Sequence, residues 1–109
     1  MGEGSFARLL AGITAFGWHE SKRAANLRKH KIDFRDVVPI INENAFVRRS
    51  DRRGEIRYQV FGNVHGEKVA VACTIEGSRC WIISARRASK AERRDLDLGI
   101  EGQSPSGQD

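Results

Sequence analysis

Residues 69–94 read VAVACTIEGSRCWIISARRASKAERR, and this stretch decides the fold. Two apolar runs flank a Gly-Ser pair at 77–78, a pattern that predicts a β-hairpin. The second run ends in a pair of arginines at 86–87. Ser89 follows as a helix N-cap, and Glu92 completes a capping box. We therefore expect the hairpin to bring both arginines to one end of a sheet, beside a basic helix, as an anion-binding edge.

The two cysteines lie on opposite arms of this hairpin. A two-residue turn would pair Cys73 with Ile82 and Cys80 with Ile75, which makes the thiols diagonal neighbours on one face of the sheet. We interpret both as small buried hydrophobic residues in a reducing compartment. No other residues at ligand spacing accompany them, so a zinc site is not expected.

The rest of the chain predicts an α+β domain. The expected order is strand, helix, helix, four strands and helix, which gives an antiparallel β-sheet with two N-terminal helices and a C-terminal helix. The elements expected before the hairpin are a short strand or anchoring turn at 16–18, helices at 21–31 and 33–38, strands at 45–47 and 55–61, and a loop at 62–66.

Length and charge narrow the possible functions. The chain has 109 residues and a formal net charge of +5, enough for one domain with its own core. We place this domain at 16–97, with an N-terminal extension at 1–15 and a disordered tail, rich in Gly, Ser and Gln, at 98–109. No apolar run reaches the roughly 18 residues of a membrane helix, so a cytoplasmic protein is expected. The basic charge favours nucleic acid or an acidic partner, with a merely soluble basic surface as the alternative.

The side chains available for catalysis are those of basic residues, histidines and carboxylates. No phosphate-binding glycine loop, metal triad or Ser-His-Asp pattern occurs, and we expect neither a metal nor a cofactor. This inventory suits RNA cleavage without a metal. In that reaction the 2′-hydroxyl attacks the adjacent phosphorus, a base removes its proton, and cations stabilise the developing charge. Arginine serves well because its guanidinium grips two phosphate oxygens and stays charged.

The candidate site combines the first helix, the strand at 55–61 and the end of the hairpin. Positions 22, 26, 29 and 30 have helical spacing and form one polar helix face, with Leu27 expected to point inward. A solvated helix surface is the alternative interpretation. The expected charge-stabilising groups are Arg57, Arg86 and Arg87, those for proton transfer are His30 and Glu55, and those for RNA binding are Lys22, Asn26, Lys29, Lys90 and Arg93.

The remaining aromatic and basic side chains are interpreted as structural. Trp18 and Trp81 are expected to anchor the core rather than to stack on bases. The alternation of Tyr58 with apolar neighbours predicts its burial. His65, in a loop next to glycine, is expected to have a structural or neutral role, and Arg79, in the hairpin turn, to be a surface charge.

The order of these motifs resembles the BrnT family, the toxins of BrnT/BrnA type II toxin–antitoxin systems. The resemblance runs from residue 16 to about residue 96, and its most specific pieces are NLRKH at 26–30 and IISAR at 82–86. One departure is His19, because family members usually carry Asp there. An Asp would cap the first helix, and its loss is expected to cost about 1 kcal/mol. Further matching residues are FGW at 16–18, Lys22, IDF at 32–34, DR at 51–52, EIR at 55–57, Gly62, RAS at 87–89 and ER at 92–93.

The resemblance implies a RelE-like fold and a metal-independent endoribonuclease that inhibits translation, acting on RNA that is free or on the ribosome. It also implies neutralisation by a BrnA-like antitoxin, which dimerises through a ribbon-helix-helix domain, binds operator DNA and represses the operon. It does not settle which residue transfers protons. The family's polar pattern falls on Lys22, Asn26, Lys29, His30, Glu55, Arg57, Arg86 and Arg87.

Two other functions would use the same basic surface. One is a non-catalytic module that binds RNA or DNA, and the other is an interaction protein whose cationic face holds the antitoxin or another acidic partner. A nuclease degrades RNA, whereas a binding module shows salt-dependent affinity and leaves RNA intact. An interaction protein does neither and co-purifies with an acidic chain.

Overall fold

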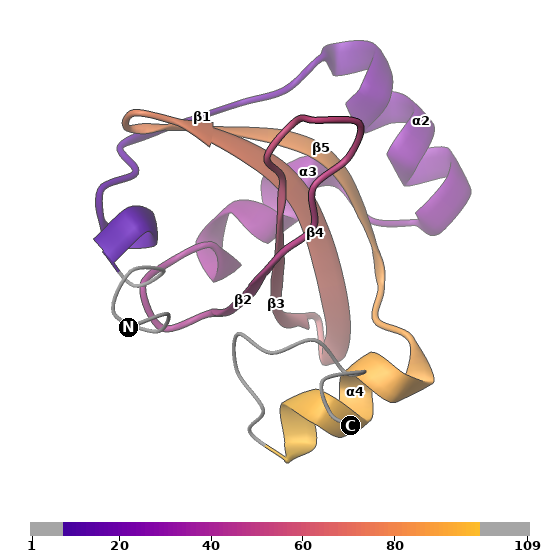
Figure 1. The fold of residues 1–109 in the computed structure, drawn as a ribbon. Coiled ribbons are helices and arrows are strands. Elements are labelled where there is room, and N and C mark those ends of the chain that lie inside the picture. Colours follow the sequence, from indigo (N-terminus) through magenta and orange to yellow (C-terminus); the bar gives the residue numbers. More distant parts are fainter. Residues whose placement is uncertain (1–7, 99–109) are drawn as a thin grey trace.

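Five strands form one sheet in the order β1-β5-β4-β3-β2 in the computed structural model, which describes residues 8–98 (Figure 1). The pairs from β2 to β5 are antiparallel, but β1 runs parallel to β5. The prediction of a purely antiparallel sheet is therefore wrong at this edge, where a long connection allows a parallel pair. The strands are β1 Ala15–Gly17, β2 Phe46–Arg49, β3 Tyr58–Val64, β4 Glu67–Glu76 and β5 Arg79–Arg87.

Helices precede β2 and follow β5, which confirms the predicted α+β class. Asp33 caps α3 by accepting a hydrogen bond of 2.9 Å from the backbone N–H of Arg35, and Pro39 lies in the 3-10 turn that follows. Residues 8–11 form a further helical segment ahead of β1. Figure 1 shows α4 beyond the end of β5, apart from α2 and α3. The helices are α2 Glu20–His30, α3 Phe34–Val37, the 3-10 helix η1 Val38–Ile40 and α4 Lys90–Asp97.

The hydrophobic core lies on the face of the sheet that α3 covers. Val69, Val71 and Cys73 alternate along β4 with buried side chains, as expected for a strand with one buried face. Phe34 and Val37 of α3 are fully buried in the same cluster. This face is therefore closed by helix packing, and functional side chains on the sheet are to be sought on the other face.

The hairpin has the predicted register next to its turn. Cys73 pairs with Ile82, and Ile75 pairs with Cys80. Both cysteines are buried and free of a disulfide, as their sequence context indicated. The match is possible because a two-residue turn fixes the pairing of the strand residues beside it.

A β-bulge interrupts the hairpin farther from the turn. Cys73 pairs with Ile82, but Ala72 pairs with Ser84, so Ile83 is an additional residue on β5. The side chains of β5 therefore change phase by one residue across this bulge. The bulge could not be predicted from the sequence, because an apolar Ile-Ile pair also fits an uninterrupted strand.

Strand β3 begins later and ends later than predicted. The expected strand at 55–61 and loop at 62–66 are replaced by a strand that runs through Val64 and a short turn at 65–66. Gly62 lies within this strand, and Ile40 packs directly against it. A Cβ at Gly62 would lie 2.7 Å from the Cβ of Ile40. This glycine therefore serves a close contact between η1 and the sheet rather than a loop.

The predicted domain limits of 16–97 stay a prediction. Leu10 is 3% exposed and lies in the core cluster, so this part of the expected N-terminal extension packs with the domain. The expected tail at 98–109 lies outside the described residues except for Leu98, the C-cap of α4. Within residues 8–98, the structure contains no helix of the length and hydrophobicity that a membrane span requires.

Candidate functional site

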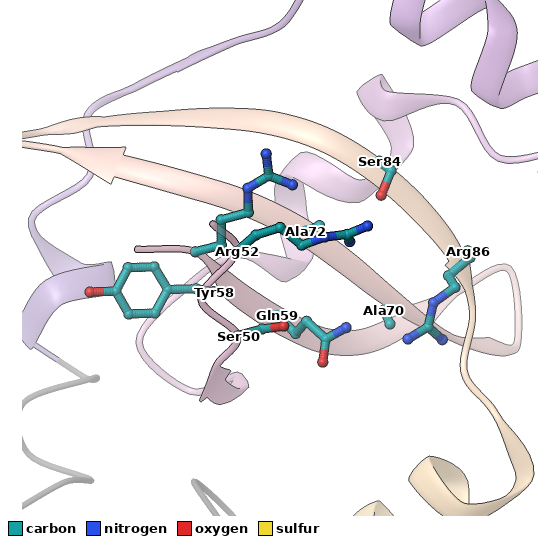
Figure 2. A pocket seen from close by; sticks show the side chains of 9 residues that line it. Ser50, Arg52, Tyr58, Gln59, Ala70, Ala72, Ser84 and Arg86 are labelled. Atoms are coloured by element: carbon teal, nitrogen blue, oxygen red, sulfur yellow. The ribbon is translucent and has the colours of Figure 1, made fainter. Parts of the chain in front are cut away.

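The open face of the sheet carries a groove with a volume of about 250 Å³. Its floor includes Ala70 and Ala72, whose small side chains leave room above the strand. Figure 2 shows Ser84 and Arg86 of β5 on one side of these alanines and side chains from residues 50–59 on the other. The complete lining is Ser50, Arg52, Arg57, Tyr58, Gln59, Ala70, Ala72, Ser84 and Arg86.

The bulge brings Arg86 to this groove. Arg86 pairs with Ala70, and Ser84 pairs with Ala72, so all four side chains share one face of the sheet. Uninterrupted alternation along β5 would turn Arg86 toward the core instead. The exclusion of Ile83 from the ladder therefore decides that Arg86, rather than Arg87, stands over the open face.

Glu92 of α4 fixes the orientation of Arg86. The Nη1 and Nη2 groups of Arg86 donate to the two carboxylate oxygens of Glu92 at 2.8 and 3.0 Å. Arg48 of β2 donates to the same carboxylate at 2.8 Å. The second hydrogen of Nη1 goes to the backbone oxygen of Arg87 at 3.1 Å. Within residues 8–98, the Nε–H of Arg86 and one hydrogen on its Nη2 therefore keep no protein partner. These two donors form a fork that fits a second carboxylate or a phosphate.

The predicted capping box is present and extends into the site. Ser89 accepts from the backbone N–H of Glu92 at 3.1 Å, and the Glu92 carboxylate accepts from the backbone N–H of Ser89 at 2.8 Å. The Glu92 side chain is only 7% exposed. Hydrogen bonds from Arg86 lower its pKa to about 2, and the Ser89 backbone and the charge of Arg48 act in the same direction. The same carboxylate raises the pKa of Arg86.

This low pKa predicts an acid sensitivity that belongs to Glu92. A carboxyl whose pKa falls from 4.5 to about 2 on folding stabilises the protein above pH 4.5 and loses that effect as the pH drops toward 2. The loss is worth roughly 3 kcal/mol. Urea unfolding at pH 7, 4 and 2.5 should therefore show a steeper fall for the wild type than for Glu92→Gln. Parallel pH profiles for the two proteins would contradict this assignment.

Residues 50–57 form the opposite wall of the groove. Arg53 and Gly54 have φ angles of 51° and 83°, which makes a tight turn possible, and Arg52 and Glu55 form an isolated bridge across it. Arg57 donates from Nε to a Glu55 carboxylate oxygen at 2.7 Å. The predicted residues Arg57 and Glu55 therefore lie together, and Arg57 lines the groove with Arg86.

Arg87, in contrast, points away from the groove. It pairs with Val69 on the core side of the sheet and lines a separate cavity with Lys31 and Glu67. Its Nε donates to Glu67, and its Nη1 lies 3.4 Å from the backbone oxygen of His30. The prediction of one site made by both arginines with the polar side of the first helix is therefore wrong, because consecutive strand residues face opposite sides.

Asn26 has a structural role rather than the predicted contact with RNA. Its side chain is 6% exposed, and its amide nitrogen donates at 2.9 Å to the backbone oxygens of Ile32 and Ala85. Its oxygen accepts from the backbone N–H of Ala85 at 3.1 Å. The Asn26 side chain thus bonds to the backbone edge of β5 at Ala85, beyond the part of β5 that pairs with β1. Leu27, expected inside, is 40% exposed instead.

The other predicted RNA-binding side chains are not part of the groove. Lys22 and Lys29 are exposed on α2, and Lys90 is exposed at the start of α4. Arg93 donates to the backbone oxygen of Ala88 at 2.8 Å, which stabilises the junction of β5 and α4. These cations lie outside the lining of the groove, and their role in binding RNA stays a prediction.

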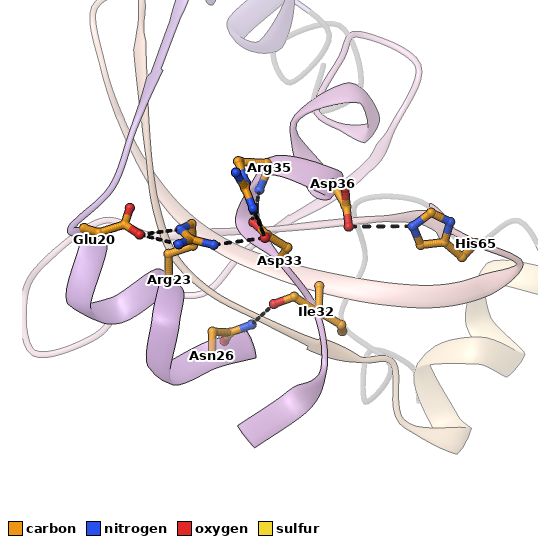
Figure 3. Close-up of polar contacts among 8 residues, drawn as sticks. All are labelled: Glu20, Arg23, Asn26, Ile32, Asp33, Arg35, Asp36 and His65. Atoms are coloured by element: carbon orange, nitrogen blue, oxygen red, sulfur yellow. Dashed lines mark hydrogen bonds and ion pairs between the residues drawn. The ribbon is translucent and has the colours of Figure 1, made fainter. Parts of the chain in front are cut away.

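A polar cluster that the sequence did not reveal ties α2 to α3 (Figure 3). Arg23 bonds to Glu20 on its own helix and donates to Asp33 at 3.0 Å. Arg35 donates to the same carboxylate at 2.7 Å. Bonds from Arg35 lower the pKa of Asp33 to about 2, with a further contribution from the charge of Arg23. The cluster fixes the angle between the two helices and is remote from the groove.

The aromatic predictions have mixed outcomes. Trp18 packs against the core and meets Phe34 edge-on at 6.0 Å, as predicted. Tyr58 is half-buried and packs against the core, and it also lines the groove. His19 makes no side-chain cap for α2, in agreement with the missing aspartate. Its ring contacts Trp81 instead, with centroids 5.1 Å apart.

The remaining comparisons with the sequence concern His65 and the groove residues that were not predicted. His65 lies in the turn that follows β3, its side chain is 81% exposed, and its Nε2 is 3.6 Å from a carboxylate oxygen of Asp36 on α3. The neutral groove residues Ser84 and Gln59 and the cation Arg52 were not anticipated. One signal was available for them: β4 alternates Val with Ala, which indicates one packed face and one face with open space.

Comparisons with known proteins identify the family. The family model described as the ribonuclease toxin BrnT of type II toxin–antitoxin systems matches residues 18–92. The crystal structure of the Brucella abortus ribonuclease toxin BrnT is similar, with 30% sequence identity, a TM-score of 0.58, and coverage of 71% of this chain and 99% of that chain. No curated protein matches the sequence. Because the family model covers well over half of the chain, this protein belongs to the BrnT family of ribonuclease toxins of type II toxin–antitoxin systems.

Proposed function

We propose that this chain is a metal-independent endoribonuclease and that it cleaves RNA in the groove of the open sheet face. The family supports ribonuclease activity in general. The observation that carries the choice of site is Arg86, which Glu92 holds over the groove by two hydrogen bonds. A guanidinium that is already oriented stabilises the charge developing on phosphate without reorganising during the reaction.

The groove suits the phosphodiester for two further reasons. Arg52 and Arg57 line it together with Arg86, so three cations face a chain of negative charges. The floor of alanines lets the phosphate approach the strand. Arg86 carries most of this role, because its free fork of Nε–H and Nη2 matches two phosphate oxygens.

The proposed reaction needs groups of the protein and of the RNA, and one proton from solvent. The 2′-oxygen forms a bond to the adjacent phosphorus while the bond from phosphorus to the 5′-oxygen breaks. This step leaves a 2′,3′-cyclic phosphate and a 5′-hydroxyl. Glu55 is the proposed base for the 2′-hydroxyl proton, because its bond to Arg57 holds it beside the groove, whereas His30 lies on α2. The leaving oxygen takes its proton from solvent.

The test is cleavage of a synthetic RNA by protein prepared without its antitoxin, in buffer containing EDTA. We expect products ending in 2′,3′-cyclic phosphate. A matched oligonucleotide with a 2′-deoxy sugar at each cleaved position should stay intact. Cleavage that requires Mg²⁺, or equal cleavage of the deoxy oligonucleotide, would contradict the mechanism. Salt-dependent binding that leaves the RNA intact would instead support the non-catalytic module.

We also propose that the biological partners follow the family pattern. The domain at 16–97 would have a RelE-like fold, act in the cytoplasm on free or ribosome-bound RNA, and inhibit translation. A BrnA-like ribbon-helix-helix antitoxin would neutralise it and link it to operator DNA. Membership of a type II toxin–antitoxin family supports an antitoxin partner. Co-expression with the neighbouring small reading frame should yield a stable complex, and a toxin that elutes alone would contradict that pairing.

A further inference from the structure

A second cavity, of about 240 Å³, lies near the tip of the hairpin. Thr74 and Trp81, which line it, are direct partners on β4 and β5. The other lining residues, Glu76 and Arg79, are the pair that flanks the turn. Residues directly opposite one another point to the same side of a sheet. The cavity is therefore built by four side chains of one sheet face.

This cavity continues the groove along the hairpin. Ala72 lines the groove and Thr74 lines the cavity, and they are successive residues on the open face of β4, about 7 Å apart. On β5 the bulge places Trp81 on the same face as Ser84. Arg86 stands opposite Ala70, whereas Trp81 stands opposite Thr74, about 13 Å farther along β4. A strand of RNA with one phosphate at Arg86 would therefore reach the cavity with a nucleotide farther along, beyond the one adjacent to that phosphate.

The Trp81 ring is held in place without belonging to the core. Gly17 packs so closely on it that a Cβ there would lie 2.5 Å from ring atom Cζ3. The His19 imidazole meets the ring edge-on, with planes at 81°. Trp81 is half-buried and is not a member of the core cluster among residues 8–98. The prediction that it anchors the core is therefore wrong, and a fixed aromatic wall of this kind suits stacking on a nucleobase.

The charged residues of the cavity match the edge of one base. Glu76 and Arg79 are exposed, and neither forms an ion pair within residues 8–98. A carboxylate accepts from the N1–H and 2-amino groups of guanine, and a guanidinium donates to guanine O6 and N7. Adenine placed in the same orientation has no proton on N1 and no 2-amino group for the carboxylate, and its 6-amino group would face the guanidinium as a second donor.

We propose that this cavity binds a guanine base of the RNA substrate, stacked on Trp81 with its edge between Glu76 and Arg79. The inference rests on the proposed function, because it assumes that RNA lies in the groove. It deepens that function by assigning a base preference a short distance along the RNA from the cleaved phosphodiester. Trp81 and Glu76 are then specificity residues, and the contact between His19 and Trp81 supports the stacking surface.

The test measures binding rather than cleavage. The full chain carrying Arg86→Ala is titrated into fluorescent oligouridine RNA that contains one central G, A or inosine, and the dissociation constant is read from anisotropy. We expect the G oligonucleotide to bind about tenfold more tightly than the A oligonucleotide, with inosine between them because it lacks the 2-amino group. Adding Glu76→Gln should remove this preference. Trp81→Ala should weaken binding of all three by about tenfold.

Controls separate recognition from folding. Glu43→Gln makes the same change of charge at another exposed position and should keep the preference for G. Trp81→Phe preserves an aromatic ring and should bind more tightly than Trp81→Ala. If Trp81→Ala does not fold, the exposed Glu76 decides the matter alone. Equal affinity for G and A, or an unchanged preference in Glu76→Gln, would overturn the proposal.

The two proposals fail in different ways. Selective binding of G by a protein that leaves RNA intact would contradict the proposed catalysis and keep the guanine site. Efficient cleavage with no preference among the oligonucleotides would keep the catalysis and remove the guanine site.

Discussion

Replacing Arg86 with Ala is expected to lower the rate of RNA cleavage by roughly 100- to 1,000-fold. The variant loses the guanidinium that Glu92 orients over the groove, and with it the fork that is free for phosphate oxygens. Single-turnover cleavage of a synthetic RNA measures the effect directly. Arg86→Lys should fall between the wild type and Arg86→Ala, because lysine keeps the charge and loses the paired donors.

Arg87→Ala is the matched control for this prediction. It removes the same side chain one residue later, on the face of the sheet where Val69 lies, and should change cleavage little. Thermal unfolding should show that both variants are folded, since Arg48 still pairs with Glu92 when Arg86 is absent. A folded Arg87→Ala that loses as much activity as Arg86→Ala would move the site to the surface beside His30.

Replacing Asn26 with Ala is expected to destabilise the fold by about 4 kcal/mol. The substitution leaves the backbone N–H and C=O of Ala85 and the C=O of Ile32 without their partner, and each buried unsatisfied group costs roughly 1–3 kcal/mol. A loss of this size is a large part of the 5–15 kcal/mol that holds a typical domain together. Urea unfolding at neutral pH measures it.

Lys29→Ala, on the same helix, provides the control for Asn26. Lys29 is exposed, and such surface substitutions usually change stability by less than about 0.5 kcal/mol. Asn26→Asp is a second informative variant, because a carboxylate still accepts from Ala85 but cannot donate to either carbonyl. It should be at least as destabilised as Asn26→Ala. An Asn26→Ala protein as stable as Lys29→Ala would show that water replaces the amide, and the structural role would be lost.

The sequence predicted the features that depend on neighbouring residues. The turn at 77–78 fixed the pairing of Cys73 with Ile82, and Ser89 with Glu92 fixed the start of α4. Both follow from local geometry and hydrogen bonding. The same locality explains why Arg57 and Glu55 were correctly placed together.

The errors arose where distant parts of the chain decide the outcome. Asn26 was assigned to the solvated side of its helix by polarity, although the unpaired edge of β5 requires a polar partner there. The parallel pairing of β1 depends on the path of the whole chain. The two arginines were assigned to one site because nothing in their immediate sequence separates them. Strand alternation places them on opposite faces, and the bulge, which is a property of two paired strands, decides that Arg86 is the one over the groove.

The number of residues in β5 beyond the bulge at Ile83, as much as their composition, is a condition for the proposed activity. Loss of one residue between Ser84 and Arg86 would bring Arg87 opposite Ala70 in place of Arg86, with no arginine substituted. Loss of Ile83 itself would give a regular ladder and keep every present pairing. In an alignment with relatives, a gap in this part of β5 would therefore change which arginine faces the groove. Aligned arginines are equivalent only when their side chains also lie on the same face of the sheet.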